Sequence, residues 1–380
     1  MNARASLSIT ALLAVLVVAV AAFLRFDPLV ALTGEPAPVP PALTIERVTV
    51  DDDGFHLRVR GDAREPVRIA QVLVNEAYWR FEQTPPGPIG RGEQVRLDIP
   101  FMWVHGEPHE LRLLTADGST FDHAIDVTTA TPVLTAGRLA GYALVGLFVG
   151  VVPVALGMAL FPVIRGAGAR GLGFVLALTL GLLAFLLVDT LAHALEAAAE
   201  SAAVFDADVM VWLIAFASFA VILALGRRHG TPRGYALALC LAFGIGVHNL
   251  GEGLAIGGAV AAGEVALGTF LVLGFTLHNV TEGIGIVTPL ARERVRWLAF
   301  LGLLLLAGLP AVFGLWIGVR AALPHWTALC LAIGAGAIAQ VLFEVGDLLR
   351  RTTAGRWAAW NPLAGFLTGV GIMYGTALLV

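Results

Sequence analysis

From about residue 138 onward, one long apolar segment follows another, with only short connections between them. Most of these segments have about 20 residues or more, the length at which a helix crosses the hydrocarbon core of a bilayer. Lipid cannot satisfy backbone N–H and C=O groups, so such segments span only as helices. With 58% hydrophobic and 14% charged residues, the chain is predicted to be a polytopic α-helical membrane protein. We expect an eight-helix bundle with spans at residues 138–164, 171–195, 209–226, 235–260, 265–289, 297–319, 326–348 and 360–380.

The residues before this bundle divide into three parts. An uncharged apolar run within residues 1–27 predicts a signal anchor, and a cleaved signal peptide is the alternative. Residues 28–42 form a Pro-rich linker. Residues 43–132 contain short runs of alternating apolar and polar residues between turn sequences, which predict a small all-β domain, an immunoglobulin-like sandwich. The aromatic residues expected in its core are Tyr78, Trp79, Phe81 and Trp103.

Arginines alternate along the connections between the apolar segments. They follow the first, third, fifth and seventh segments: Arg165 and Arg170; Arg227, Arg228 and Arg233; Arg292, Arg294 and Arg296; Arg350, Arg351 and Arg356. The other connections are acidic or nearly uncharged, except that the connection before the seventh segment holds Arg320 and His325. By the positive-inside rule, the Arg-rich connections are cytoplasmic. We therefore expect a plasma (inner) membrane protein whose β-domain and C-terminus are extracytoplasmic.

Two consecutive apolar segments carry nearly the same polar sequence. His248-Asn249-Leu250-Gly251-Glu252-Gly253 lies in the fourth segment, and His278-Asn279-Val280-Thr281-Glu282-Gly283 lies in the fifth. In each, His and Glu are four residues apart and share one helix face. Ionisable groups at bilayer depth are costly unless they are paired, which makes them candidates for function. The structural alternative is that these side chains only hydrogen-bond across the bundle.

A short connection makes the two helices antiparallel neighbours, so two imidazoles and two carboxylates can converge at one depth. Such a set suits Zn²⁺ and tolerates Fe²⁺, Mn²⁺ or Cd²⁺. The two asparagines, one position further round each helix, can serve a neighbouring site or orient the ligands. The predicted metal site therefore comprises His248, Asn249, Glu252, His278, Asn279 and Glu282.

Further polar residues mark a candidate path for an ion. Asp189, His193 and Glu196 share a face of the second segment and could form an entry, although an interfacial polar cluster is the alternative. Gln340 and Glu344 in the seventh segment are candidates for the exit, unless Arg350 simply pairs with an acidic residue of that helix.

The doubled motif on consecutive helices resembles the fourth and fifth helices of the ZIP (Zrt-/Irt-like) metal transporters. Residues 334–344 are similar to the seventh helix of that family and residues 365–374 to the eighth, so the resemblance covers the domain at residues 136–380. It implies uptake of a divalent transition metal, chiefly Zn²⁺, into the cytoplasm by a homodimer of eight-helix protomers. It also implies a principal site at His248, Glu252, His278 and Glu282, and a second site at Asn249, Asn279 and Glu282.

The sequence departs from the family pattern at two acidic positions. Leu309-Pro310 stands where many relatives have Glu-Pro, and Asn279 stands where Asp is frequent. Both changes remove negative charge, so we expect the second metal site to be weak or absent. The connection at residues 226–234, which is long and His-rich in many relatives, carries only His229 here.

Other functions fit the sequence less well. An intramembrane metalloprotease would need His-Glu-x-x-His on a helix, which does not occur, and we expect no enzymatic activity. The net charge of −4 argues against a nucleic-acid partner. No prosthetic group is expected, and the expected partners are the metal ion, membrane lipid and a second copy of the chain. The alternative function is a metal-responsive receptor or sensor whose β-domain binds a partner.

Overall fold

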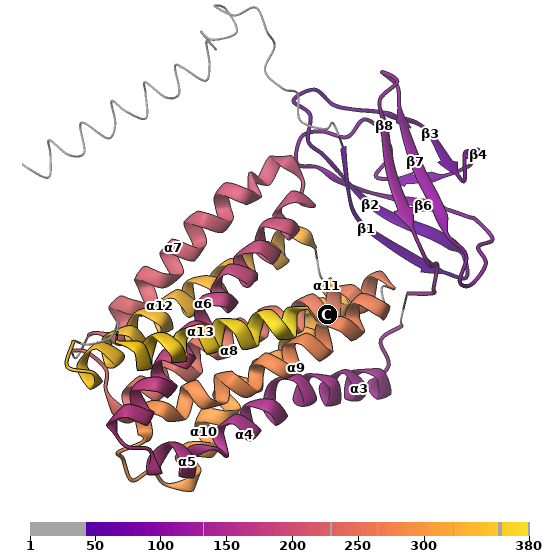
Figure 1. Cartoon of the computed structure of the whole chain (residues 1–380). Helices are drawn as coiled ribbons and strands as arrows, with labels where there is room; N and C mark the ends of the chain where they lie inside the picture. Colours follow the sequence, from indigo (N-terminus) through magenta and orange to yellow (C-terminus); the bar gives the residue numbers. More distant parts are fainter. Residues whose placement is uncertain are drawn as a thin grey trace, which may run out of the picture. The chain divides into compact units, whose positions relative to one another are not determined.

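Alternating apolar residues after Ala42 form two antiparallel sheets in the computed structural model (Figure 1). The structure describes residues 43–131, 133–228, 230–263, 265–321, 323–355 and 359–378. The predicted signal anchor, the Pro-rich linker and His229 lie outside the described residues. The strands are β1 (Leu43–Asp51), β2 (Gly54–Gly61), β3 (Ile69–Val74), β4 (Ala77–Trp79), β5 (Glu82–Thr84), β6 (Gln94–Ile99), β7 (His109–Thr115) and β8 (Thr120–Ile125).

The two sheets share one apolar core. One sheet has the order β1-β2-β6-β5 and the other has the order β4-β3-β7-β8. Every second residue of a central strand points inward, as Phe55, Leu57 and Val59 do from β2, and all three are fully buried. Of the aromatic residues expected in the core, Phe81 and Trp103 pack against it. The expectation was wrong for Tyr78 and Trp79, which are 67% and 37% exposed, because both lie on β4, a three-residue edge strand.

The rest of the described chain is helical. Its elements are α3 (Ala136–Gly146), η1 (Leu147–Val151), α4 (Val152–Met158), α5 (Phe161–Gly166), α6 (Ala169–Ala199), η2 (Ala203–Phe205), α7 (Ala207–Gly226), α8 (Gly234–Ala262), α9 (Val265–Val287), η3 (Thr288–Leu290), α10 (Trp297–Gly308), α11 (Pro310–Ala321), α12 (Pro324–Thr352) and α13 (Trp360–Ala377). Over the described residues, seven helical stretches are long and apolar enough to cross a membrane, as a multi-pass membrane protein requires.

The eighth predicted span forms helix α13, which is not among these seven stretches. It has 18 residues, begins with Trp360-Asn361-Pro362 and is interrupted by glycines, so its apolar run is short.

Prolines interrupt two of the apolar helical stretches that surround α8 and α9. Pro153 follows the π-helical turn η1, and Pro310 separates α10 from α11. A proline inside a helix lacks the N–H that would bond the carbonyl four residues earlier. Carbonyl groups at both breaks are therefore available to side chains of other helices.

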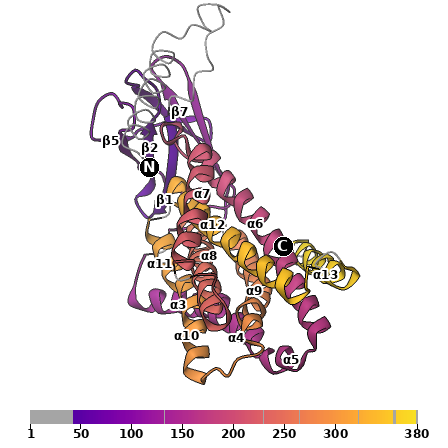
Figure 2. The same cartoon turned by 90° about the vertical axis from the view of Figure 1, so that its left-hand side faces the viewer.

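Helix α8 lies in the middle of the bundle, where it packs against α9, α10, α11 and α12 (Figures 1 and 2). Glycines permit the closest of these approaches. A Cβ atom on Gly253 would overlap the carbonyl oxygen of Ala311 on α11, and one on Gly283 of α9 would overlap that of Val154 on α4. The two helices that carry the doubled motif are thus held tightly by the helices around them.

Candidate metal centre

Helices α8 and α9 bring the two copies of the motif together in the interior of the bundle. All six predicted ligands are buried: His248, Asn249, Glu252, His278, Asn279 and Glu282 are each no more than 6% exposed. The surroundings follow from the sequence, because the neighbouring positions are mostly Leu, Val, Ile, Gly and Ala, with Thr281 as an exception. The site is therefore a polar cluster sealed within an apolar bundle.

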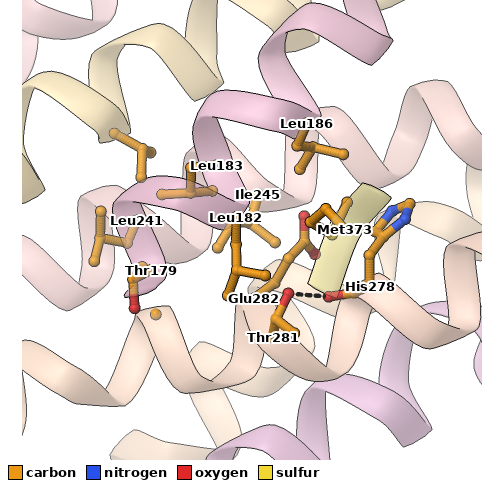
Figure 3. Close-up of a pocket in the computed structure, with 12 residues that line it drawn as sticks. Thr179, Leu182, Leu183, Leu186, Leu241, Ile245, His278, Thr281, Glu282 and Met373 are labelled. Carbon is orange, nitrogen blue, oxygen red and sulfur yellow. Dashed lines mark hydrogen bonds between the residues drawn. The ribbon is translucent and has the colours of Figure 1, made fainter. Parts of the chain in front are cut away.

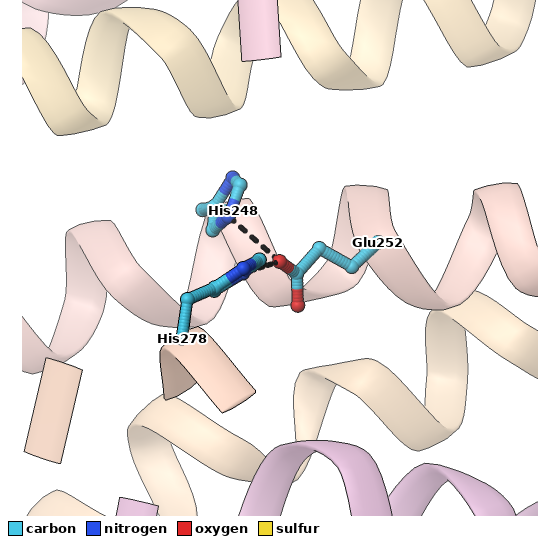
Figure 4. Close-up of side chains that lie close together, drawn as sticks. All are labelled: His248, Glu252 and His278. Carbon is cyan, nitrogen blue, oxygen red and sulfur yellow. Dashed lines mark hydrogen bonds and ion pairs between the residues drawn. The ribbon is translucent and has the colours of Figure 1, made fainter. Parts of the chain in front are cut away.

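Glu252 lies between the two imidazoles (Figure 4). Its Oε1 atom is 2.5 Å from His278 Nε2 and 3.0 Å from His248 Nε2. One ligand atom from each of these three residues lies within 4.8 Å of the others, close enough for one ion to contact all three. The sequence-predicted convergence of the two helix faces is therefore present in the structure.

Glu282 lies beside this group without a hydrogen bond of its own. Its Oε1 atom is 4.0 Å from His248 Nε2, and neither of its oxygens has a hydrogen-bond partner among the described residues. It borders a cavity of about 10 Å³, which His278 and apolar side chains such as Leu182 and Leu186 also line (Figure 3). A cavity of that size has room for about one water molecule or one small ion.

The two asparagines are held by carbonyls at the helix breaks. Asn279 Nδ2 donates to Val149 O at 3.0 Å and to Glu252 Oε2 at 3.1 Å. Val149 is four residues before Pro153, which has no N–H to donate to the Val149 carbonyl. Asn249 Nδ2 donates to Ala307 O at 3.1 Å, one residue after Leu306, whose carbonyl faces the missing N–H of Pro310. Each amide nitrogen thus donates to a carbonyl, and neither amide oxygen has a hydrogen-bond partner among the described residues.

The centre thus holds an excess of acceptors over donors. In the described residues, the buried oxygens without a hydrogen-bond partner include Asn249 Oδ1, Asn279 Oδ1, Glu282 Oε1 and Glu282 Oε2. Buried acceptors of this kind are costly unless a donor or a cation satisfies them. Nitrogen and oxygen donors without thiolate suit Zn²⁺, Fe²⁺ or Mn²⁺ rather than Cu⁺.

One contact of the centre comes from a residue that the sequence analysis did not consider. Thr190 of α6 is 3% exposed, and its Oγ1 atom lies 3.5 Å from His248 Nδ1. This contact can orient the imidazole. A single threonine in an apolar helix forms no sequence motif. The one sequence signal for Thr190 is its position next to Asp189, a predicted entry residue.

The predicted entry residues lie outside this centre. His193 Nδ1 is 3.6 Å from Asp189 Oδ2, and the two side chains are 44% and 34% exposed. Glu196 is exposed. Helix α6 reaches the centre through Thr190 and not through these three residues, whose role as an entry stays a prediction.

The predicted exit residues lie along α12, which passes the centre at Gly334 beside His248. Gln340 is fully buried, and neither its Nε2 nor its Oε1 atom has a partner among the described residues. Glu344 is also buried and accepts from Arg227 Nε at 2.7 Å and Nη2 at 3.1 Å. Arg350 does not pair with Glu344; it lies 3.9 Å from Asp347.

A scan against models of known protein families finds no match for this chain, and a search of curated proteins finds none either. The function must therefore be inferred from the side chains of the buried centre.

Proposed function

We propose that the chain transports divalent transition-metal ions, Zn²⁺ foremost, across the membrane into the cytoplasm through the centre on α8 and α9. One observation carries this proposal: four buried oxygen atoms, from Asn249, Asn279 and Glu282, have no hydrogen-bond partner among the described residues, and they lie around two imidazoles and two carboxylates. Two carboxylates balance the charge of one divalent cation, which then occupies a neutral site inside an apolar bundle.

The chemistry of the donors favours a cargo ion over a resident one. Imidazole and carboxylate both exchange a metal for protons, so protonation can assist release. The small cavity beside Glu282 is closed by apolar side chains, so transport requires the helices to move in order to open a route.

Residues along α12 support a path from the centre to the cytoplasm that is closed in this structure. Gln340 and Glu344 follow Gly334 by six and ten residues, so they lie about 9 Å and 15 Å further along the helix axis. Gln340 lies near the end of α7, because a Cβ atom built on Gly226 would be 3.9 Å from Gln340 Nε2. Arg227 follows Gly226 directly. We propose that the bidentate Arg227–Glu344 pair closes the cytoplasmic end, and that the exit opens when it separates.

The finer assignments are proposals as well. The chain resembles the ZIP transporters in its doubled motif, and with it we propose an eight-helix protomer in the plasma membrane that forms a homodimer. The second metal site that the resemblance implies would take neutral amide oxygens from Asn249 and Asn279. We propose that this second site is weak, because amide oxygens carry no negative charge.

The strand orders β1-β2-β6-β5 and β4-β3-β7-β8 support an immunoglobulin-like β-domain, since they match two sheets of the types ABED and C′CFG.

Uptake of radioactive Zn²⁺ into proteoliposomes tests the proposed transport. The unmodified chain should accumulate Zn²⁺, and Fe²⁺, Mn²⁺ and Cd²⁺ should compete. The double variant His248→Ala/Glu282→Ala should lose uptake, whereas His105→Ala/Glu107→Ala, the same changes at exposed positions before β7, should retain it. Uptake that the first pair of changes leaves intact would contradict the proposed site.

A metal sensor is the second candidate, favoured by contacts between the β-sheet residues and the helices. Arg47 of β1 donates to the carbonyls of Val319 and Arg320 at the end of α11, and Glu46 lies 3.9 Å from His325 on α12. A sensor would bind Zn²⁺ at the same centre without accumulating it in the vesicle lumen.

A further inference from the structure

A second cavity, of about 360 Å³, lies beside the first sheet at the end of α11. Cavities that hold small ligands begin at about this volume. The charged residues that line it are Arg47, Arg58, Arg96, Arg320, Asp51 and His56. They come from β1, β2, β6 and α11, so the fold gathers four arginines that are far apart in the sequence.

The carboxylates at this cavity are already bound to cationic groups of the protein. His56 Nε2 lies 2.8 Å from Asp51 Oδ1, and His56 Nδ1 lies 2.5 Å from Asp98 Oδ1. Arg96 Nε donates to the same oxygen of Asp98 at 2.6 Å. These two acids therefore interact with His56 and Arg96, and the other three arginines are left without a carboxylate.

Those three arginines have only neutral partners or none in the described part of the chain. Arg47 donates to two backbone carbonyls of α11, at 3.2 Å and 3.4 Å. Arg58 and Arg320 are exposed, and their side chains make no hydrogen bond or ion pair with a described residue. Burial, and after it the positive charge of Arg58, lowers the pKa of the Arg47 guanidinium. The positive charges thus repel one another across the cavity.

We propose that this cavity binds an anion that carries a phosphate group, held by Arg58, Arg320 and Arg47. A guanidinium group binds two phosphate oxygens at once, in a bidentate manner. Several guanidinium groups around one cavity therefore favour an anion with several oxygens, such as phosphate, over chloride. Arg320 ends a helical stretch that is long and apolar enough to cross a membrane, and phospholipid headgroups lie at that level. The headgroup of an anionic phospholipid and a free phosphate share this chemistry. The site is independent of the metal centre, so either proposal can fail without the other.

The experiment uses the full chain in nanodiscs and two probes. In nanodiscs of phosphatidylcholine, inorganic phosphate is titrated by calorimetry against chloride at equal ionic strength. In the second arm, phosphatidylglycerol is added to the nanodiscs, and lipid that stays bound after detergent extraction is counted by native mass spectrometry. The variant is Arg58→Gln/Arg320→Gln. The matched control is Arg64→Gln/Arg68→Gln, which removes the same charge from exposed positions outside the cavity.

We expect binding to fall on the order of 10-fold for each arginine removed from the cavity and to stay unchanged in the control. Phosphate binding alone identifies a soluble anion as the ligand, and retention of phosphatidylglycerol identifies the headgroup. The proposal is overturned if neither probe binds the unmodified chain, or if the control pair weakens binding as much as the cavity pair.

Folding is monitored in the same samples. Because Arg58 and Arg320 have no hydrogen-bond or ion-pair partner in the described part of the chain, the ligand-free double variant should unfold at the same temperature as the unmodified chain or higher. If the double variant does not fold, the same binding measurements are made on the single variant Arg58→Gln, whose change is at an exposed position. Unchanged binding of both probes in that variant overturns the proposal.

Discussion

At the scale of single residues, the two copies of one motif have different environments. Glu252 contacts both imidazoles and accepts from Asn279, whereas neither oxygen of Glu282 has a hydrogen-bond partner by geometry among the described residues. The His-x-x-x-Glu spacing was sufficient to predict that these residues share one buried centre. It could not predict the difference between the two glutamates, because Thr190, Val149 and Ala307 belong to other helices and have no motif of their own.

The asparagines should differ in their effect on metal affinity. Asn279→Ala removes a donor to both Val149 and Glu252, whereas Asn249→Ala removes a donor to Ala307 alone. We expect Asn279→Ala to weaken Zn²⁺ binding by about 10- to 100-fold and Asn249→Ala to weaken it less. Competition with a fluorescent Zn²⁺ chelator measures both. Equal affinities in the two variants would contradict the orienting role of Asn279.

His56 should make stability depend on pH. Burial alone would lower its pKa, but hydrogen bonds to Asp51 and Asp98 and their negative charges raise it on balance. The folded pKa is therefore above the unfolded value of about 6.5, so the stabilisation is complete below about pH 6.5 and is lost as the pH rises through the folded pKa. Thermal unfolding of the full chain should show this loss, and His56→Gln should abolish it. A pH profile that His56→Gln leaves unchanged would exclude this group as its cause.

At the scale of elements, proline breaks and glycines hold α8 and α9 in position. The sequence predicted the apolar helices well, because length and composition determine which segments can cross lipid. It did not indicate that Pro153 frees a carbonyl for Asn279, since that contact joins residues 130 apart in the chain. The sequence analysis treated Leu309-Pro310 only as the loss of an acidic side chain, whereas the break there lies beside the carbonyl that holds Asn249.

The contact between α9 and α4 should not tolerate a larger residue. A Cβ atom on Gly283 would overlap Val154 O, so Gly283→Ala should destabilise the fold by about 1–3 kcal/mol. Gly302→Ala on α10 is the matched control, because nothing lies within 4 Å of the added methyl group. That control should be neutral or stabilising by up to about 1 kcal/mol. Chemical unfolding of both variants in detergent compares them, and equal stabilities would argue against the close helix packing.

The end of α7 should be sensitive to the loss of Arg227. Arg227→Gln leaves the carboxylate of Glu344, only 2% exposed, without its partner. We expect a loss of stability on the order of 2 kcal/mol, below the value for a fully buried pair because Arg227 is 31% exposed. Arg227→Gln/Glu344→Gln should recover most of that loss. Failure of the double variant to recover would show that Arg227 acts through its packing on Phe343, 4.7 Å from the ring centroid.

At the scale of the whole molecule, long-range contacts join the β-sheet residues to the helices. Asp62 accepts from Val204 N at 3.0 Å, and the guanidinium of Arg60 lies 5.1 Å from the ring centroid of Phe205. The sequence predicted both kinds of structure from local patterns, but contacts between residues more than 100 positions apart leave no such pattern. The four-arginine cavity was missed for the same reason.

A transporter passes metal through its buried centre across the membrane, whereas a resident metal site or a sensor only retains it. The most direct test is the amount of Zn²⁺ protected inside proteoliposomes, compared with the amount of protein, after external metal is removed by a membrane-impermeant chelator. We predict that protected Zn²⁺ exceeds the protein many-fold and falls to the level of empty liposomes in His248→Ala/Glu282→Ala. Protected Zn²⁺ that never exceeds the metal bound to the protein itself would contradict the account.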